Sequence, residues 1–425
     1  MSRRGLLGAG VLAGVLAASG VPLQARTRGG ALRLGLAGSL PGRDWTRAPA
    51  VLAQGAVYET LTEIGPTGDL RGELAEAWEA APGARVWHIA LRPEARFHDG
   101  RPLGAEDVLA SLARHRDGVL SGVEEIAPQG PLALRITLAE GDPDFPLRLA
   151  DPRLVIGPEG RLDGTGSGLY RLAATSPDRL RPDRLRLDRV AAHPRDGRAG
   201  WFDAIEARSL PDPAQRLDAL LAGEVDVVDP LPPDLLRVAQ EAGLLATAVQ
   251  GNRQLHARLP PDADPALAAV LPRALDRAAL AEAWGGTPAA DHPLGPLHPA
   301  LAALPPPAFD PGAAAALAGH APLLSAWGGR PTEDATFRLA LAGPWGPLRD
   351  DPDLRAHLAA ARATEGEARA AHYAAAQALC AARAPVAVVA HIPAVTLHSP
   401  ALAHDAVSPL APLDGGRIAK RWWFA

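Results

Sequence analysis

Hydrophobic residues along this chain follow the spacing of strands in some stretches and the spacing of helices in others. Apolar side chains at every second position predict strands, and a helix instead gathers its apolar side chains at spacings of three and four residues. Residues 105–112 show the helical spacing, with Glu106 and Asp107 placed to stabilise the positive N-terminus of the helix. We expect strands at residues 31–36, 86–91, 132–138 and 384–390, and helices at residues 48–58, 105–112, 214–221 and 365–383. This mixture predicts an α/β or α+β fold and excludes an all-helical array.

The first 25 residues have the layout of an export signal. Arg3 and Arg4 precede an uncharged apolar stretch, residues 6–18, and Ala25 provides a small residue for cleavage. The stretch is shorter than the ~20 residues of a spanning helix, so we expect a signal peptide at residues 1–25 and a periplasmic mature chain. The arginine pair resembles a twin-arginine signal, and both the twin-arginine and the general secretory route stay open.

Composition excludes several classes of protein. The chain has 43 basic and 48 acidic residues, a net charge of -5, and Lys420 as its single lysine. That balance offers no broad basic face for nucleic acid. Cys380 is the only cysteine, so an internal disulfide and a cysteine-based zinc site are both excluded.

Catalytic motifs are absent from the sequence. There is no Gly-x-Ser-x-Gly elbow, and the 13 histidines form neither a pair at the i,i+4 spacing nor a His-Glu-x-x-His motif. We therefore expect no enzyme activity, no cofactor and no metal site, and a periplasmic hydrolase is disfavoured.

Several separated segments together resemble one bacterial family. They include Val57-Tyr58-Glu59-Thr60-Leu61, then Phe97-His98-Asp99-Gly100, then Gly164 to Tyr170, then Gly223-Glu224-Val225-Asp226-Val227, and later Phe309-Asp310-Pro311-Gly312. In this order they are similar to the family 5 solute-binding proteins, which include oligopeptide-, dipeptide- and nickel-binding proteins of ABC importers. The resemblance spans almost the whole chain after residue 25.

The resemblance implies an α/β, two-lobed periplasmic binding protein of type II (cluster C-like) with a central ligand cleft. We place lobe I at residues 26–249 plus 395–425 and lobe II at 250–394. It also implies a monomer that captures a small solute or short peptide by lobe closure and delivers it to ABC permease subunits. In the family, a longer segment stands where residues 322–326 stand here, so we expect a shortened lobe II.

The resemblance also yields candidate ligand-binding residues. Peptide-binding relatives use a Trp followed three residues later by an Asp to help hold the α-amine of the peptide, whereas this chain has Trp327 and Arg330. Because a guanidinium suits a carboxylate, we expect a short peptide or another carboxylate-bearing ligand at Arg330, with Trp327 against its apolar or planar part. Asp44 and Trp45 lie in the loop that corresponds to the first cleft loop of the family, and are further candidates.

Two other functions stay open. A shortened lobe II also fits a periplasmic receptor or partner-binding module with no transport role. Nickel-complex binding is a third reading, because nickel-binding relatives exist, although no local histidine pattern supports it.

Overall fold

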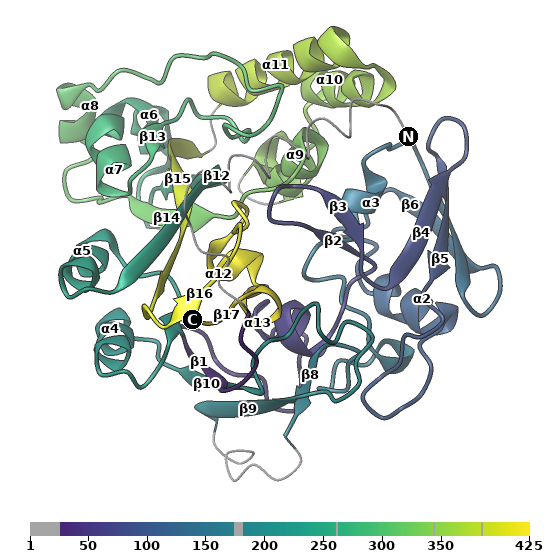
Figure 1. The fold of residues 1–425 in the computed structure, drawn as a ribbon. Helices are drawn as coiled ribbons and strands as arrows, with labels where there is room; N and C mark the ends of the chain where they lie inside the picture. Colours follow the sequence, from purple (N-terminus) through teal and green to yellow (C-terminus); the bar gives the residue numbers. More distant parts are fainter. Residues whose placement is uncertain (1–25, 174–181, 261, 343–344, 384–385) are drawn as a thin grey trace, which may run out of the picture.

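Strand β1 (Ala31–Leu36) forms where the alternating pattern predicts it and lies inside a nine-stranded sheet (Figure 1). The computed structural model describes residues 26–173, 182–260, 262–342, 345–383 and 386–425. Strand β1 pairs in parallel with its two neighbours, and Leu32, Leu34 and Leu36 are buried. The strands follow in the order β14 (Leu323–Trp327), β12 (Leu245–Arg258), β15 (Ala387–His398), β11 (Val227–Val228), β1, β10 (Ala204–Ser209), β9 (Arg184–Arg189) and β8 (Tyr170–Leu172), with β13 (Thr287–Pro288) beside β15.

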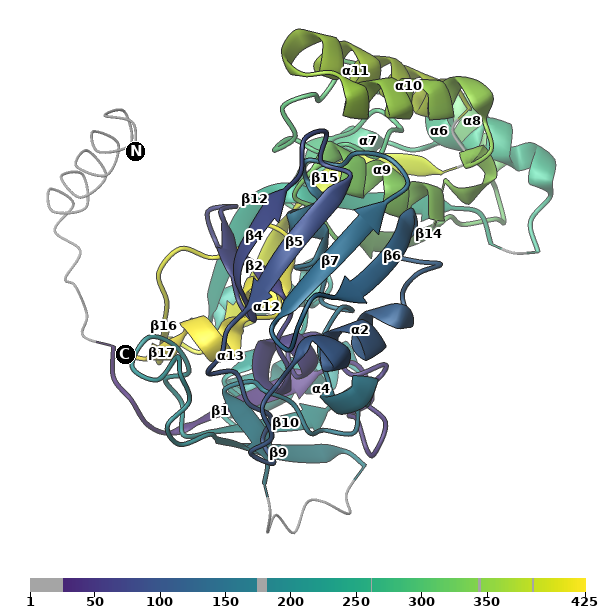
Figure 2. The same ribbon diagram turned by 90° about the vertical axis from the view of Figure 1, so that its right-hand side faces the viewer.

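A second sheet of four antiparallel strands has its own hydrophobic core (Figure 2). Its order is β4 (Ala75–Ala80), β5 (Val86–Leu91), β7 (Ala133–Leu138) and β6 (Val123–Pro128). Strands β5 and β7 bury every second side chain against helix α2 (Ala105–Ala113) and the short helix α3 (Phe145–Arg148). The predicted face of α2 is the buried one, and Asp107 caps its N-terminus by accepting from the Gly104 N–H at 3.0 Å.

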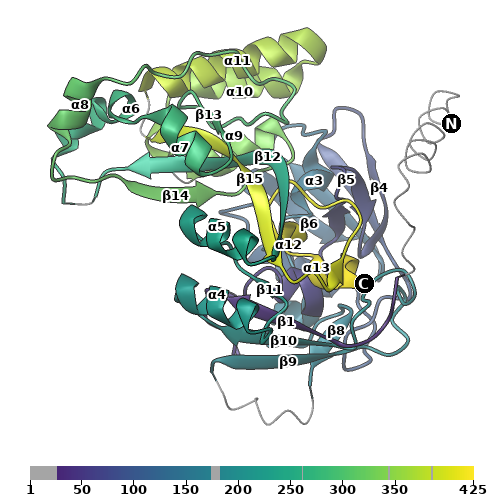
Figure 3. The ribbon, with the colours of Figure 1, turned by 60° about the vertical axis from the view of Figure 1, so that its left-hand side comes forward.

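Two long strands, β12 and β15, run from the larger lobe into the smaller one (Figures 1 and 3). At one end they pair through Leu245 to Val249 beside β11, and at the other through Arg253 to Ala257 beside β13 and β14. The register of the pair shifts between Val249 and Arg253. A second shift follows between Leu255 and His256, so the two lobes are joined by extended backbone whose pairing is irregular at two places.

Helices supply most of the rest of both lobes. The larger lobe has α4 (Pro213–Leu221) and α5 (Pro233–Glu241), which pack on a small core with Val228 and Leu397. The smaller lobe contains two further cores, around Trp345 and around Leu255. Its helices are α6 (Leu271–Ala274), α7 (Arg277–Ala283), α8 (Pro311–Ala316), α9 (Glu333–Ala342), α10 (Pro352–Ala363) and α11 (Gly366–Arg383).

The C-terminal segment returns to the larger lobe and packs on its main core through Ile418 and Trp422. It contains two short helical turns, α12 (Pro412–Gly415) and α13 (Ile418–Arg421), and the small pair β16 (Leu402–Ala403) and β17 (Trp423–Phe424). The hairpin β2 (Thr62–Ile64) and β3 (Leu70–Gly72) lies across from it. This segment and hairpin form part of the wall between the lobes.

The predicted helix at residues 48–58 is only partly correct. The structure has a wider π-helical turn, Ala53–Val57, in which the Gly55 N–H donates to the Ala50 carbonyl and the Val57 N–H to the Leu52 carbonyl. A Cβ on Gly55 would lie 2.1 Å from the carbonyl oxygen of Gly416, so close approach of the C-terminal segment decides the local shape. The predicted signal peptide, residues 1–25, and the start of the predicted strand at 384–390 lie outside the described residues.

Candidate functional site

A cavity of about 120 Å³ lies where the two lobes meet. Its walls come from α3 and the loop after it in the larger lobe, from residues 329–331 and α9 in the smaller lobe, and from residues 408–421 of the C-terminal segment. Elements from three distant parts of the sequence therefore line one pocket.

Arg330 is the lining arginine that has no ion pair within 4 Å in the part of the chain that the structure describes. Its Nη1 donates to the carbonyl oxygens of Gly329 at 2.9 Å and Gly328 at 3.4 Å, while Nε is buried without a hydrogen-bond partner. Burial lowers the pKa of Arg330, and the Asp151 carboxylate offsets this only in part. The side chain is partly buried and its charge is not neutralised locally.

The four other lining arginines are each neutralised. Arg148 and Arg338 both lie near Asp142, at 3.3 Å and 3.5 Å. Arg417 and Arg421 bind Glu63, at 3.2 Å and 2.6 Å. Arg330 therefore differs from the other lining arginines, because it has no carboxylate partner among the described residues. A ligand carboxylate would be its first ion-pair partner.

Asp414 lines the same cavity from a turn of unusual backbone conformation. Leu413 has φ 55° and ψ 38°, Asp414 has φ 56° and ψ 45°, and Gly415 and Gly416 also have positive φ. Left-handed geometry costs about 1–2 kcal/mol for each residue with a Cβ, so the surrounding contacts must stabilise this turn. Oδ1 of Asp414 accepts from the Ser408 N–H at 2.8 Å and from Arg421 at 2.9 Å, while Oδ2 is buried without a partner.

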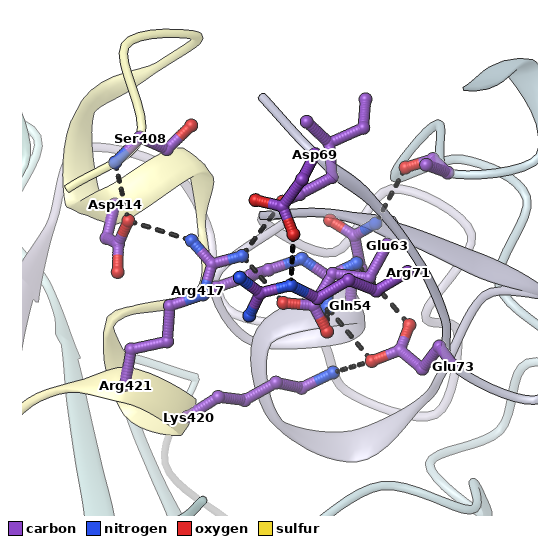
Figure 4. A network of polar contacts seen from close by, with 12 residues as sticks. Gln54, Glu63, Asp69, Arg71, Glu73, Ser408, Asp414, Arg417, Lys420 and Arg421 are labelled. Carbon is purple, nitrogen blue, oxygen red and sulfur yellow. Dashed lines mark hydrogen bonds and ion pairs between the residues drawn. The ribbon is translucent and has the colours of Figure 1, made fainter. Parts of the chain in front are cut away.

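Behind this wall lies a buried network of charges (Figure 4). Glu73 is fully enclosed and binds Arg417 at 2.9 Å, Lys420 at 2.5 Å and Arg195 at 3.0 Å. Burial alone would raise the pKa of Glu73, but the charges of Arg417, Lys420 and Arg195 outweigh it and hold the pKa well below its ordinary value. Since Arg417 also lines the cavity, the network fixes the cavity wall to strand β3 and its neighbours.

Comparison with known proteins identifies the family of this two-lobed chain. The sequence profile of the bacterial extracellular solute-binding proteins, family 5, matches residues 69–349. The chain belongs to this family. The predicted family and the predicted two-lobed α/β fold class are both confirmed.

Curated relatives of this family 5 protein match it over part of their length. It is 30% identical over 152 residues to the HTH-type transcriptional regulator SgrR of Photorhabdus laumondii, covering 33% of this chain and 27% of the regulator. It is 26% identical over 218 residues to the probable D,D-dipeptide-binding periplasmic protein DdpA of Escherichia coli, covering 48% of this chain and 42% of DdpA. These alignments thus span less than half of either relative.

Solved structures share the fold of this family 5 protein over nearly the whole chain. The periplasmic binding protein DppA from Helicobacter pylori, in complex with the peptide STSA, has a TM-score of 0.78 at 16% identity and covers 94% of this chain and 99% of its own. The binding protein AgaA from A. tumefaciens, in complex with agropinic acid, has a TM-score of 0.77 at 17% identity, covering 93% and 99%. At these identities the likeness establishes the fold alone.

The structure brings one of the four predicted ligand residues to the cavity of this family 5 protein. Arg330 lines it, and Trp327 lies behind Arg330, with its ring 5.8 Å from the guanidinium carbon, against His256 and Trp345. Trp45 is buried in the core of the larger lobe, edge-on to Tyr58, and Asp44 is exposed and accepts from the Thr46 N–H. Neither is among the lining residues.

Sequence reasoning missed Asp414 and the network behind it. The available signals were the Asp-Gly-Gly sequence at 414–416, which is typical of a turn with positive φ, and the single lysine, Lys420. Within the described ranges, no group of three or more His, Cys, Asp or Glu side chains has the arrangement of a metal site. No helix in those ranges is long and apolar enough to cross a membrane.

Ion pairs hold the lobes of this family 5 protein together at the edge of the cavity. The acidic loop at residues 140–144 of the larger lobe meets one arginine from each of three helices of the smaller lobe. Arg338 of α9 binds Asp142, Arg362 of α10 binds Glu140, and Arg369 of α11 binds Asp144 at 2.6 Å. The two lobes are therefore in direct contact at this edge.

We expect removal of two of these acidic groups to favour opening. Exposed ion pairs contribute about 0–1 kcal/mol each, so the double variant Glu140→Gln/Asp144→Asn should shift the balance towards open forms by roughly fivefold. Small-angle X-ray scattering would show a larger radius of gyration than in the wild type. The matched control, Glu124→Gln/Glu125→Gln, removes two exposed charges whose partners Arg85 and Arg135 lie within the larger lobe. Equal radii for both variants would exclude this role of the loop.

Proposed function

We propose that this protein is an exported, periplasmic substrate-binding protein of an ABC importer, and that it captures a small carboxylate-bearing solute, such as a short peptide or peptide-like molecule, between its lobes. The observation that carries the proposal is Arg330, a partly buried cation in the interlobe cavity with no ion pair there. A guanidinium binds a carboxylate through two parallel hydrogen bonds, and no carboxylate of the described residues lies within 4 Å of Arg330 to compete for them.

The position of Arg330 also gives a reason for closure. Arg330 belongs to the smaller lobe, and the opposite walls of the cavity belong to the larger lobe and the C-terminal segment. A ligand that contacts both lobes favours the closed state by its differential affinity for that state. We place the lobe boundaries at 249/250 and 394/395, so that β12 and β15 are the connecting strands, and we propose that the closed monomer is the form that ABC permease subunits recognise.

Thermal unfolding tests this proposal. The chain from residue 26 onward would be heated with a panel of di- to pentapeptides, small carboxylates and nickel–histidine complexes, because a ligand that binds only the folded form raises the midpoint. We expect carboxylate-bearing solutes to raise it. The variant Arg330→Gln should weaken their binding by about tenfold or more, the usual effect of losing a charged hydrogen-bond partner.

The control for this variant is Arg258→Gln, which removes an exposed arginine of β12 that does not line the cavity. Its ligand affinities should equal those of the wild type. Undiminished carboxylate binding by Arg330→Gln would refute the assignment of Arg330, and a panel that produces no shift at all would refute capture of a small solute.

A second candidate function is that of a periplasmic receptor without a transport role. The chain is 30% identical over 152 residues to a regulator named SgrR, and this similarity supports a regulatory role as the second candidate. Both functions require ligand binding, so only the protein partner of the ligand-bound form distinguishes them. Reconstitution with an importer would show ligand-dependent stimulation of its ATPase for a transport protein and none for a receptor.

A further inference from the structure

The larger of the two irregularities between β12 and β15 lies where these strands pass from one lobe to the other (Figure 3). The ladder runs along β12 as far as Val249 and resumes at Arg253, so that residues 250–252 lie opposite Pro393 alone. Proline has no N–H to donate to a ladder, and within sheets it is found at edges and bulges. The bulge at residues 250–252 is therefore a break in the pairing that the sequence itself requires.

Gly251, in the middle of this bulge, is held against the larger lobe. A Cβ at this position would lie 2.1 Å from the carbonyl oxygen of Pro409, far inside van der Waals contact. Pro409 belongs to the C-terminal segment, which packs on the main core of the larger lobe. Only glycine fits at this point of the bulge, and its neighbour there is a backbone atom of the larger lobe.

Asn252, the next residue, is held by the smaller lobe instead. Its side chain is almost completely buried. Oδ1 accepts from the Leu297 N–H at 2.7 Å, and Nδ2 donates to the carbonyl oxygen of Arg330 at 3.0 Å. A Cβ on Gly295 would lie 2.7 Å from the Cα of Asn252, so the loop before Leu297 is packed directly against the bulge. One side chain of the bulge is thus bonded to two separate loops of the smaller lobe.

His298 reinforces the contact with Arg330. Nδ1 of His298 accepts from the Gly295 N–H at 3.0 Å, so in the neutral ring Nε2 carries the proton. Nε2 donates to the carbonyl oxygen of Arg330 at 3.1 Å. Burial lowers the pKa of His298, which favours this neutral form. The Arg330 carbonyl therefore accepts one hydrogen bond from the bulge and one from the loop that the bulge holds.

Two consecutive residues are therefore fixed to different lobes, and hinges are commonly one or a few such residues that absorb the change of backbone angles. We propose that the lobes turn about the Gly251–Asn252 linkage, and that Asn252 is a positioning residue that makes Arg330 move as one body with the smaller lobe. This inference rests on the proposed function, which assigns ligand binding to Arg330. A turn at this linkage leaves the bonds of Asn252 intact. It breaks instead the bond of 3.1 Å from the Gly329 N–H to the Leu410 carbonyl oxygen, which joins the two lobes.

A double-mutant cycle tests the positioning role. Asn252→Asp keeps an oxygen for the Leu297 N–H and loses the NH₂ group that donates to the Arg330 carbonyl oxygen. Affinities for a panel of di- to pentapeptides and small carboxylates are measured by calorimetry on the wild type, on this variant, on Arg330→Gln and on the double variant. Gln250→Ala is the matched control, because it removes an exposed amide from the same bulge.

We expect Asn252→Asp to weaken the carboxylate-bearing solutes that bind the wild type by roughly fivefold, the usual effect of one lost hydrogen bond. In the Arg330→Gln background the same change should alter their affinities by less than about twofold, because the two residues act together. Gln250→Ala should bind as the wild type does. A merely structural role of Asn252 would weaken binding by the same factor in both backgrounds, and that result would overturn the positioning role.

The pivot is tested without a ligand. Spin labels are attached to Ala222→Cys, after α4 in the larger lobe, and to Glu367→Cys, in α11 of the smaller lobe; both positions are exposed, and the native cysteine is buried. Double electron–electron resonance then measures the distance between the lobes. Gly251→Ala should shift this distance, because its methyl group does not fit against the C-terminal segment. Gly38→Ala should leave it unchanged, because no atom lies within 4 Å of its Cβ position.

The outcomes separate the failure of this inference from the failure of the proposed function. Equal distances in Gly251→Ala and Gly38→Ala would overturn the pivot. If solutes bind and the cycle shows no coupling, capture stands and the role of Asn252 is wrong. If no carboxylate-bearing compound binds the wild type, the proposed function and the positioning role fail together, and the distances alone decide the pivot. Asn252→Ser, which removes the amide without adding a charge, replaces Asn252→Asp in the cycle if that variant does not fold.

Discussion

Replacing Glu73 by glutamine should destabilise the protein by roughly 3–5 kcal/mol, the usual consequence of removing one partner from a buried ion pair. The change leaves Arg417 and Lys420, which are both almost completely enclosed, without their shared carboxylate. It also weakens the hydrogen bond from the Thr60 N–H to Oε2 of Glu73. Urea denaturation monitored by circular dichroism would measure the loss of unfolding free energy.

Two further variants make this prediction specific. Glu76→Gln removes an exposed carboxylate three residues away on β4 and should change the unfolding free energy by less than about 0.5 kcal/mol. The double variant Glu73→Gln/Lys420→Met should recover part of the loss, because it removes one of the buried cations together with the carboxylate. A loss below about 1 kcal/mol for Glu73→Gln would mean that water or rearrangement satisfies the two cations.

Stability should fall steeply as the pH drops from about 6.5 to about 4. Burial lowers the pKa of each of five histidines to about 4, namely His98, His193, His256, His292 and His391. Between these limits the unfolded chain binds a proton at each histidine and the folded chain does not. Each group therefore lowers the unfolding free energy by up to about 1.4 kcal/mol per pH unit, and has no effect on it above pH 6.5 or so.

The slope of unfolding free energy against pH measures this proton uptake. Near pH 5 these five histidines contribute roughly four protons per molecule. The buried Asp291 carboxyl, whose pKa burial raises to about 6, subtracts roughly one, and Asp229, Glu59 and Asp414, whose pKa values burial also raises, contribute with the same opposite sign. His391→Phe should reduce the uptake by about one proton, and Nδ1 of His391 has no hydrogen-bond partner among the described residues to lose. A flat profile between pH 6.5 and 5 would contradict the prediction.

Local sequence patterns were enough to predict the elements whose shape is set locally. Strand β1, helix α2 and helix α11 lie within one or two residues of the expected ranges, because burial of one face follows the spacing of apolar residues. The helix expected at 48–58 is only partly correct, because Gly55 packs against the backbone of Gly416, more than 350 residues away in the sequence. A single-sequence pattern contains no information on that contact.

The difference between local patterns and long-range contacts also explains which site residues could be predicted from the sequence. Arg330 was predicted because it departs from a family motif at one position, and it does line the cavity. Asp414 was missed because its importance comes from backbone conformation and from two partners, Ser408 and Arg421, that only the folded chain brings together. Trp45 was a natural candidate as an aromatic residue in a loop, yet core packing against Tyr58 accounts for its position.

The pairing of Glu73 with Arg417 and Lys420 also constrains the order in which the molecule is assembled. These partners are separated by 344 and 347 residues, so the carboxylate meets its cations only after all the residues between them have been synthesised. Contacts of such long sequence separation slow folding, because the loop they close must be ordered first. The same C-terminal stretch supplies Asp414 to the cavity wall. The cavity wall is therefore complete only after residues that are made far apart in time have met.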